Sequence, residues 1–80
     1  MTALLANVVA LATTKHNLPA PEMRRALRIA AGLSQQQVAN GLGVSRSAVD
    51  HWEKGRREPR AQHLAEYAYL LQQLQEILAA

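Results

Sequence analysis

The amino-acid sequence predicts an all-α protein, a compact bundle of about five helices that contains a helix-turn-helix. The composition is rich in Ala, Leu and Gln and has no Phe, which favours helix over strand. Apolar residues recur at helical spacings along most of the chain. Glycine and proline separate these stretches by short connections, so we expect residues 1–80 to form a single domain.

The N-terminal part of the chain is predicted to contain two helices. Residues 1–18 comprise an extra helix at 3–13, with a wide apolar face, and its linker. No basic residue precedes this helix and it is too short to span a membrane, so we expect neither a signal peptide nor a membrane anchor. A second helix is predicted at 21–31, ended by Gly32. Its expected inward side chains are Met23, Leu27, Ala30 and Ala31, and its expected surface charges are Arg24, Arg25 and Arg28. For Arg24 and Arg25, a role in solubility and a contact with phosphate are equally expected.

The predicted helix-turn-helix covers residues 34–55. Ser34 begins the pattern S-x-x-Q, which is a capping box for the first helix. Gly43 supplies the left-handed conformation of the turn, and Ser45 caps the second helix at 45–54. Two short helices joined by a few residues that include a glycine are typical of this motif. The inward side chains are expected to be Val38, Ala39, Leu42, Val49 and Trp52.

The last predicted helix covers residues 61–80. One side of it is apolar at helical spacing, through Leu64, Tyr67, Leu71, Leu74 and Leu78. Further apolar side chains widen this surface beyond what one small core requires, namely Tyr69, Leu70 and Ile77. We therefore expect the terminal helices to bury apolar surface against each other, against a second copy, against the rest of a longer protein or against a partner protein.

The charge distribution favours a polyanion as the partner. The net charge is +3, and eight of the nine Lys and Arg residues lie between Arg24 and Arg60, where only three acidic residues oppose them. A basic segment between neutral and acidic ends suits contact by one face of the protein. The chain has no cysteine, which fits a reducing cytoplasm and excludes thiol chemistry.

Catalytic and metal-binding constellations are not apparent in the sequence. His16, His51 and His63 lack the close spacing of metal ligands. Asp50 and Glu53 lie three residues apart on one predicted helix, but no candidate nucleophile accompanies them. We therefore expect no enzyme activity, no metal and no cofactor.

Docking geometry assigns base reading to the start of the second helix of the motif. Such a recognition helix inserts its N-terminal end into the major groove of DNA. Arg46 is the strongest candidate for direct reading, because arginine donates two hydrogen bonds to guanine O6 and N7. Ser47 and His51 are expected to reach a base or a phosphate, and Asp50 to accept from cytosine or to steer Arg46.

Phosphate contacts are expected from residues around the recognition helix. Gln35 lies at the N-terminus of the first helix of the motif, where free backbone N–H groups also favour a phosphate. For Arg57 or Arg60, the alternative to a phosphate contact is insertion into a minor groove. The expected phosphate-binding residues are Gln35, Ser45, Lys54, Arg56, Arg57, Arg60 and Arg28.

The run AGLSQQQVANGLGVSRSAVDHWEKGRREP, from Ala31 to Pro59, resembles the Cro and lambda-repressor-like helix-turn-helix family, also called the xenobiotic-response-element family. The resemblance covers about residues 22–74 and rests on a highly specific motif. It implies a bundle of four or five helices that usually acts as a dimer on a near-palindromic operator. The helix at 3–13 precedes the usual start of the domain, and Gly41 stands where the family more often has a helix former.

The resemblance also implies residue roles. Arg46, Ser47, Asp50 and His51 match the positions through which the family usually reads bases. The residue matching Gln35 contacts the DNA backbone and braces the recognition helix. The residue matching Arg28 pairs with the acid of a W-E dipeptide, here Trp52 and Glu53, and Trp52 matches an inward position. These three residues, Arg28, Trp52 and Glu53, are therefore expected to brace the recognition helix.

The leading function predicted from the sequence is that of a repressor, bound to operator DNA as a homodimer in the cytoplasm of a prokaryotic cell or a phage-infected host. The alternative is an antitoxin or accessory subunit whose apolar terminal helices bind a partner protein. Binding to RNA or single-stranded DNA is disfavoured, because the sequence lacks the surface aromatic residues on which bases stack.

Overall fold

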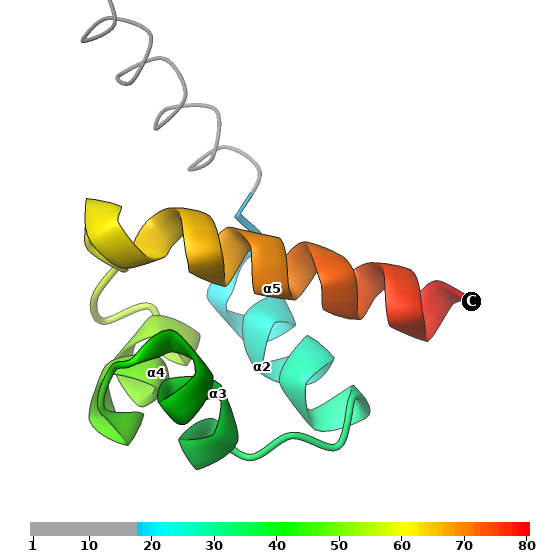
Figure 1. Cartoon of the computed structure of the whole chain (residues 1–80), viewed down its shortest axis with the longest axis horizontal. Coiled ribbons are helices and arrows are strands. Elements are labelled where there is room, and N and C mark those ends of the chain that lie inside the picture. The colour runs from blue at the N-terminus through cyan, green and yellow to red at the C-terminus, as the bar shows by residue number, and fades with distance from the viewer. Residues whose placement is uncertain (1–17) are drawn as a thin grey trace, which may run out of the picture.

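The computed structural model describes residues 18–80 and contains four helices in that range (Figure 1). Their bounds are Pro21–Ala30 (α2), Gln35–Leu42 (α3), Arg46–Glu53 (α4) and Ala61–Ala79 (α5). The described part of the chain has no strand, which agrees with the predicted all-α class. The helix expected at 3–13 lies outside the described residues, so the bundle seen here has four helices rather than five.

Helix α2 begins and ends where local chemistry predicts. Pro21 occupies its first turn, and Gly32 adopts a φ of 75° just after it. Its buried face, however, differs from the prediction. Leu27 is buried as expected, but Met23 is 50% exposed and Ala30 is also exposed, whereas Arg24 is only 5% exposed. The prediction that Arg24 lies on the surface is therefore wrong.

The helix-turn-helix forms through the predicted caps. The Ser34 hydroxyl accepts from the Gln37 amide, and the Gln37 side chain accepts from the Ser34 amide, which completes the capping box. Gly43 ends α3 in the left-handed conformation, with a φ of 70°. The Ser45 hydroxyl accepts from the Ala48 amide and starts α4. Each cap satisfies backbone N–H groups that a helix end leaves free.

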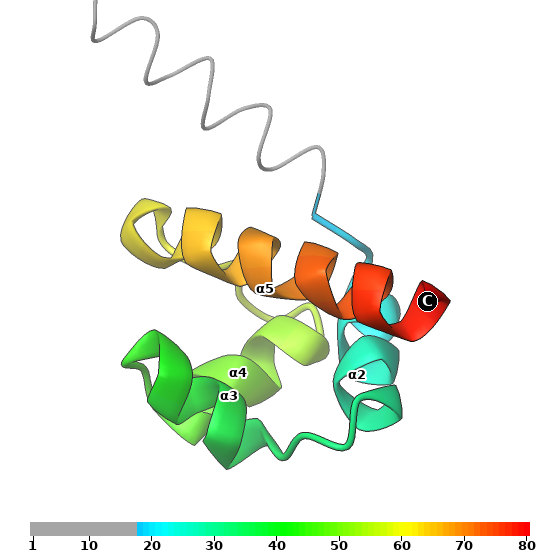
Figure 2. The ribbon, with the colours of Figure 1, turned by 45° about the vertical axis from the view of Figure 1, so that its right-hand side comes forward.

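Helix α5 lies across the other three and closes the core (Figures 1 and 2). The buried apolar side chains of all four helices form this core, from Leu27, Val38, Ala39, Val49, Trp52, Leu64, Tyr67, Leu71 and Leu74. The rings of Trp52 and Tyr67 meet with their centroids 4.8 Å apart. Leu78, on the same apolar side of α5 as the buried residues, is 41% exposed, because the end of α5 extends past the other helices.

Two neighbouring glycines are expected to respond in opposite ways to substitution by alanine. Gly41 has no positive φ, and a Cβ there would meet open space, so Gly41→Ala should raise the free energy of unfolding by about 1 kcal/mol. Gly43→Ala should lower it by about 1–2 kcal/mol, because a left-handed φ is unfavourable for alanine. Urea denaturation monitored by circular dichroism measures both values. Equal effects of the two substitutions would contradict this account of the turn.

Candidate nucleic-acid interface

The first turn of α4 presents polar side chains to solvent while the opposite face packs into the core. Arg46 and Ser47 are exposed at this end of the helix. Val49 and Trp52 are buried on the other side and fix the helix against the bundle. Because the N-terminal end is the part of a recognition helix that enters a major groove, the exposed residues lie where bases would be read.

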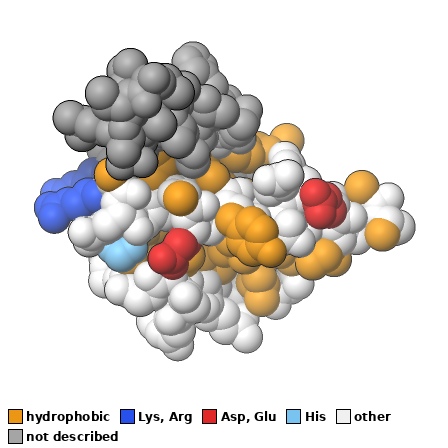
Figure 3. Space-filling model, turned by 45° about the horizontal axis from the view of Figure 1, so that its top comes forward, with side chains coloured by type: hydrophobic (Ala, Val, Ile, Leu, Met, Phe, Trp, Pro, Cys, Tyr) orange, Lys and Arg blue, Asp and Glu red, His pale blue; other side chains and the backbone are white. Residues whose placement is uncertain are grey.

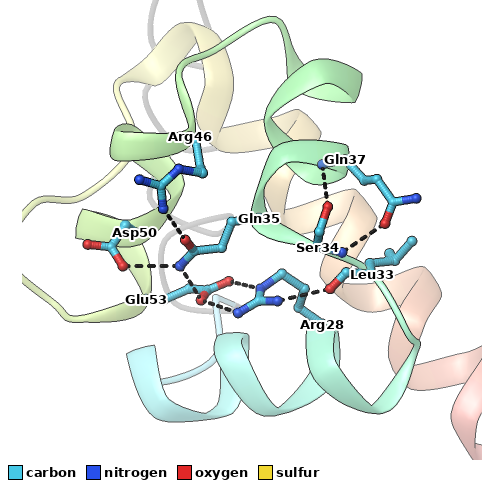
Figure 4. Close-up of polar contacts among 8 residues, drawn as sticks. All are labelled: Arg28, Leu33, Ser34, Gln35, Gln37, Arg46, Asp50 and Glu53. Carbon is cyan, nitrogen blue, oxygen red and sulfur yellow. Dashed lines mark hydrogen bonds and ion pairs between the residues drawn. The ribbon is translucent and has the colours of Figure 1, made fainter.

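Gln35 connects the two helices of the motif (Figure 4). Its Oε1 accepts from Arg46 Nη1 at 3.1 Å, and its Nε2 donates to Asp50 Oδ1 and to Glu53 Oε1, both at 3.1 Å. One side chain at the start of α3 thus contacts three side chains of α4. The expectation that Asp50 steers Arg46 takes an indirect form here, because Gln35 stands between the two.

The predicted ion pair between Arg28 and Glu53 is present. Arg28 Nε donates to Glu53 Oε2 at 2.6 Å and Nη2 donates to Glu53 Oε1 at 3.0 Å, while Nη1 donates to the Leu33 carbonyl at 2.9 Å. The Glu53 side chain is only 2% exposed. The hydrogen bonds with Glu53 raise the pKa of Arg28 above its ordinary value. This pair joins α2 to the last residue of α4, at the opposite end of that helix from the exposed Arg46 and Ser47.

Asp50 is held as a carboxylate on the half-buried side of α4. Hydrogen bonds from Lys54 and Gln35 lower the pKa of Asp50 below its ordinary value, with Lys54 Nζ at 2.9 Å from Oδ2. Ionised Asp50 can only accept hydrogen bonds, which suits a donor such as the amino group of cytosine. His51 is half-buried, and its Nδ1 is buried with no hydrogen-bond partner among the described residues. The imidazole therefore has only Nε2 to offer to DNA.

The expected phosphate-binding residues are distributed around this end of the molecule rather than gathered in one cluster. Ser45 lies at the start of α4, whereas Lys54, Arg56 and Arg57 follow its other end, and all four are exposed. Lys54 is paired with Asp50 in the free protein. Arg60 is exposed at the start of α5, beyond the loop. Three of these basic residues thus belong to a short segment that leaves the recognition helix.

Two residues whose pairing the sequence did not predict join this segment to α2. Arg24 Nη1 and Nη2 donate to the two carboxylate oxygens of Glu58, at 3.2 and 3.0 Å. Arg24 also donates to the carbonyls of Pro19 and Trp52. The available signal was the single acidic residue after two arginines in RREP, which does not identify a partner for Glu58 thirty-four positions away.

A metal cluster and a membrane-spanning helix are both absent from residues 18–80. No group of three or more His, Cys, Asp or Glu residues is placed there to hold a metal ion. The helices in this range include none with the length and hydropathy that crossing a membrane requires.

Comparison with known proteins agrees with this geometry. Residues 25–75 match the family model described as Helix-turn-helix (HTH_3), which spans all four helices except the ends of α2 and α5. No match was found among curated proteins or among solved structures. Domains of the matched family bind DNA and are typically non-catalytic. Since the match covers more than half of the sequence, the chain belongs to the Cro/C1-type helix-turn-helix family, the family of the xenobiotic-response-element regulators.

Proposed function

We propose that this protein is a transcriptional repressor that reads a specific double-stranded DNA sequence through the recognition helix at 45–54. The observation that carries the proposal is the position of Arg46, exposed at the start of α4 and held by Gln35. An arginine oriented before binding loses less side-chain entropy when it docks on a guanine. Occupation of a promoter by such a protein would block RNA polymerase.

Base reading in this proposal depends on four side chains, and affinity depends on a wider set. Arg46 binds guanine, Asp50 accepts from cytosine, and Ser47 and His51 contact a base or a neighbouring phosphate. The phosphate contacts come from residues on both sides of the recognition helix, namely Gln35, Ser45, Lys54, Arg56, Arg57, Arg60 and Arg28. Arg28 is the most constrained of these, because Glu53 and Leu33 already occupy its donors.

A homodimer is part of the proposal, because two recognition helices one helical turn of DNA apart would read a palindrome. Apolar side chains are exposed along the face over α5 that Figure 3 shows. Tyr69 and Ile77 of α5 are 64% and 65% exposed. An apolar groove also runs between α3 and α5, lined by Val38, Leu42 and Leu70 among others. We assign this surface to contact with a second copy of the chain.

Selection of binders from a random duplex library tests both parts of the proposal. Enrichment of an inverted repeat, with half-site centres about one helical turn apart, is the result expected of a dimeric reader. Enrichment of a single half-site would keep the reading helix and contradict the dimer. Without enrichment, and with weak, steeply salt-dependent binding to any duplex, charge attraction alone would remain and the proposal would fail.

Arg46→Ala should weaken binding to the selected duplex by about 1–3 kcal/mol and relax the preference at one base position. The reason is the loss of two hydrogen bonds to one guanine. Arg46→Lys is the matched control, because it keeps the charge and loses the paired donors. It should bind scrambled DNA like the parent protein while discriminating less well at the same position. An unchanged base preference in both variants would remove Arg46 from the reading surface.

A second candidate function has one observation in its favour. The α3–α5 groove is also suited to an apolar segment of another protein, as an antitoxin or accessory subunit would require. Sedimentation of the purified chain separates the two uses of the surface. A self-associating chain favours the repressor dimer, whereas a monomer that fails to enrich any duplex favours the partner-binding role.

A further inference from the structure

Arg24 is a buried arginine whose hydrogen bonds join three segments of the chain. Its side chain is 5% exposed, and burial of an arginine requires that its donors be satisfied. Nε donates to the Pro19 carbonyl at 2.7 Å, and Nη1 donates to the Trp52 carbonyl at 3.1 Å. The remaining bonds go to Glu58, which Nη1 and Nη2 approach in a bidentate arrangement.

Two of the three residues that Arg24 contacts, Trp52 and Glu58, lie before the basic loop and at its end. Here the basic loop means residues 54–58, which carry Lys54, Arg56 and Arg57. Trp52 lies just before it, at the end of α4, and Glu58 is its last residue. The Arg24 guanidinium therefore contacts the end of α4, two residues before the loop, and the last residue of the loop. Within the loop, the Arg56 and Arg57 amides donate to the His51 carbonyl at 3.0 and 3.5 Å, so its backbone folds back on α4.

We propose that Arg24 and Glu58 form a clasp that positions the basic loop for contact with DNA phosphates. This inference rests on the DNA-binding function proposed above and adds to it two positioning residues that touch no DNA. A loop held at both ends presents Arg56 and Arg57 in one arrangement, so less conformational entropy is lost when the duplex binds. Arg24 and Arg28 stand one turn apart on α2, and the second braces the recognition helix while the first braces the loop after it.

The charge of Glu58 makes the proposal testable. An acid within a basic loop opposes the attraction of DNA, so simple electrostatics predicts that its removal strengthens binding. The clasp predicts the reverse for Glu58→Gln, because a neutral amide cannot accept both Arg24 donors through charged oxygens. Glu58 is 56% exposed, so the substitution removes no packed side chain.

Glu22→Gln is the matched control for this experiment. Glu22 is an exposed acid in the first turn of α2, and its neighbour Pro21 lies beside Gly55, at 3.1 Å from where a Cβ on Gly55 would stand. The substitution Glu22→Gln therefore removes one negative charge, as Glu58→Gln does, next to a residue that lies beside the loop. It leaves the Arg24–Glu58 pair unchanged. Both variants and the parent chain are titrated with the selected duplex and a scrambled duplex across a range of salt concentrations.

The expected result is that Glu58→Gln binds both duplexes about three- to tenfold more weakly, with its base preference unchanged. Its salt dependence should also become shallower, by about 0.9 in the slope of log K against log salt for each phosphate that the protein no longer neutralises. Partial unfolding would lower the active fraction and leave that slope unaltered. Glu22→Gln should bind as tightly as the parent chain or more tightly.

Binding by Glu58→Gln at the level of Glu22→Gln, or tighter, would overturn the clasp and leave the DNA-binding function standing. Failure of the parent chain to prefer any duplex would overturn both. Amide relaxation measured by NMR on the free protein gives a readout that needs no DNA. The backbone of residues 55–58 should gain motion in Glu58→Gln and not in Glu22→Gln, and equal motion in the two would count against the clasp.

Discussion

Replacing Arg28 with methionine is expected to lower the free energy of unfolding by about 3–5 kcal/mol, because it leaves a charge buried without its partner. Glu53 is 2% exposed and receives two hydrogen bonds from the Arg28 guanidinium. After the substitution Gln35 is the one side chain within residues 18–80 that still donates to the Glu53 carboxylate. Small domains are stable by about 5–15 kcal/mol, so this single change removes a large part of the total. Urea denaturation monitored by circular dichroism measures the loss.

The double substitution Arg28→Met with Glu53→Leu distinguishes the effect of losing the whole ion pair from the effect of losing one partner. Replacing both ends of a buried ion pair by apolar side chains is often neutral or stabilising, so the double variant should recover most of the stability. It should nevertheless bind the selected duplex more weakly than the parent chain, since Gln35 loses its Glu53 partner and holds Arg46 less firmly. A double variant no more stable than Arg28→Met would contradict this account, because the loss would then not come from the unpaired charge of Glu53.

Local signals in the sequence predicted most of the helical framework. The caps at Ser34 and Ser45 and the turn at Gly43 depend only on neighbouring residues, and all three form as expected. Val49 and Trp52 were identified as inward residues by their helical spacing, and both are buried. Information of this kind is available without the fold, because a cap or a turn involves atoms only a few residues apart.

The charged interior could not be predicted in the same way. Hydropathy placed Met23 inside and Arg24 outside, and the structure reverses both. Arg24 becomes buried because carbonyls and a carboxylate from three separate segments satisfy its donors, including Glu58 at a sequence separation of 34. No local pattern encodes such a set of partners, since they come together only when the helices have packed.

The hydrogen bonds of Gln35 depend partly on the local sequence and partly on how the helices pack. Its place at the start of α3 followed from the capping pattern, and its role as a brace was implied by the family resemblance. Its bonds to Arg46, Asp50 and Glu53 depend on the angle between α3 and α4. That angle is set by the core residues beneath the turn. The sequence therefore predicts which residues face DNA, and the packing decides which of them share hydrogen bonds.

Trp52→Ala is expected to lower the free energy of unfolding by about 3–5 kcal/mol, the range typical of large aromatic residues truncated in a core. The Trp52 side chain is 5% exposed and packs on the Tyr67 ring with a tilt of 46°. This ring pair joins α4 to α5, so truncation of Trp52 should leave a cavity beside Tyr67. Circular dichroism on thermal and urea denaturation gives the change without depending on tryptophan fluorescence.

Trp52→Phe is the control that distinguishes packing from any direct contact with DNA. A phenyl ring keeps an aromatic surface against Tyr67, so this variant should lose less than half as much stability as the alanine variant. Measured well below its melting temperature, it should retain the base preference of the parent chain, because a buried ring stacks on no base. A large loss of base preference in a stable Trp52→Phe protein would mean that the tryptophan reaches the duplex, and that α4 lies differently on DNA from the free protein.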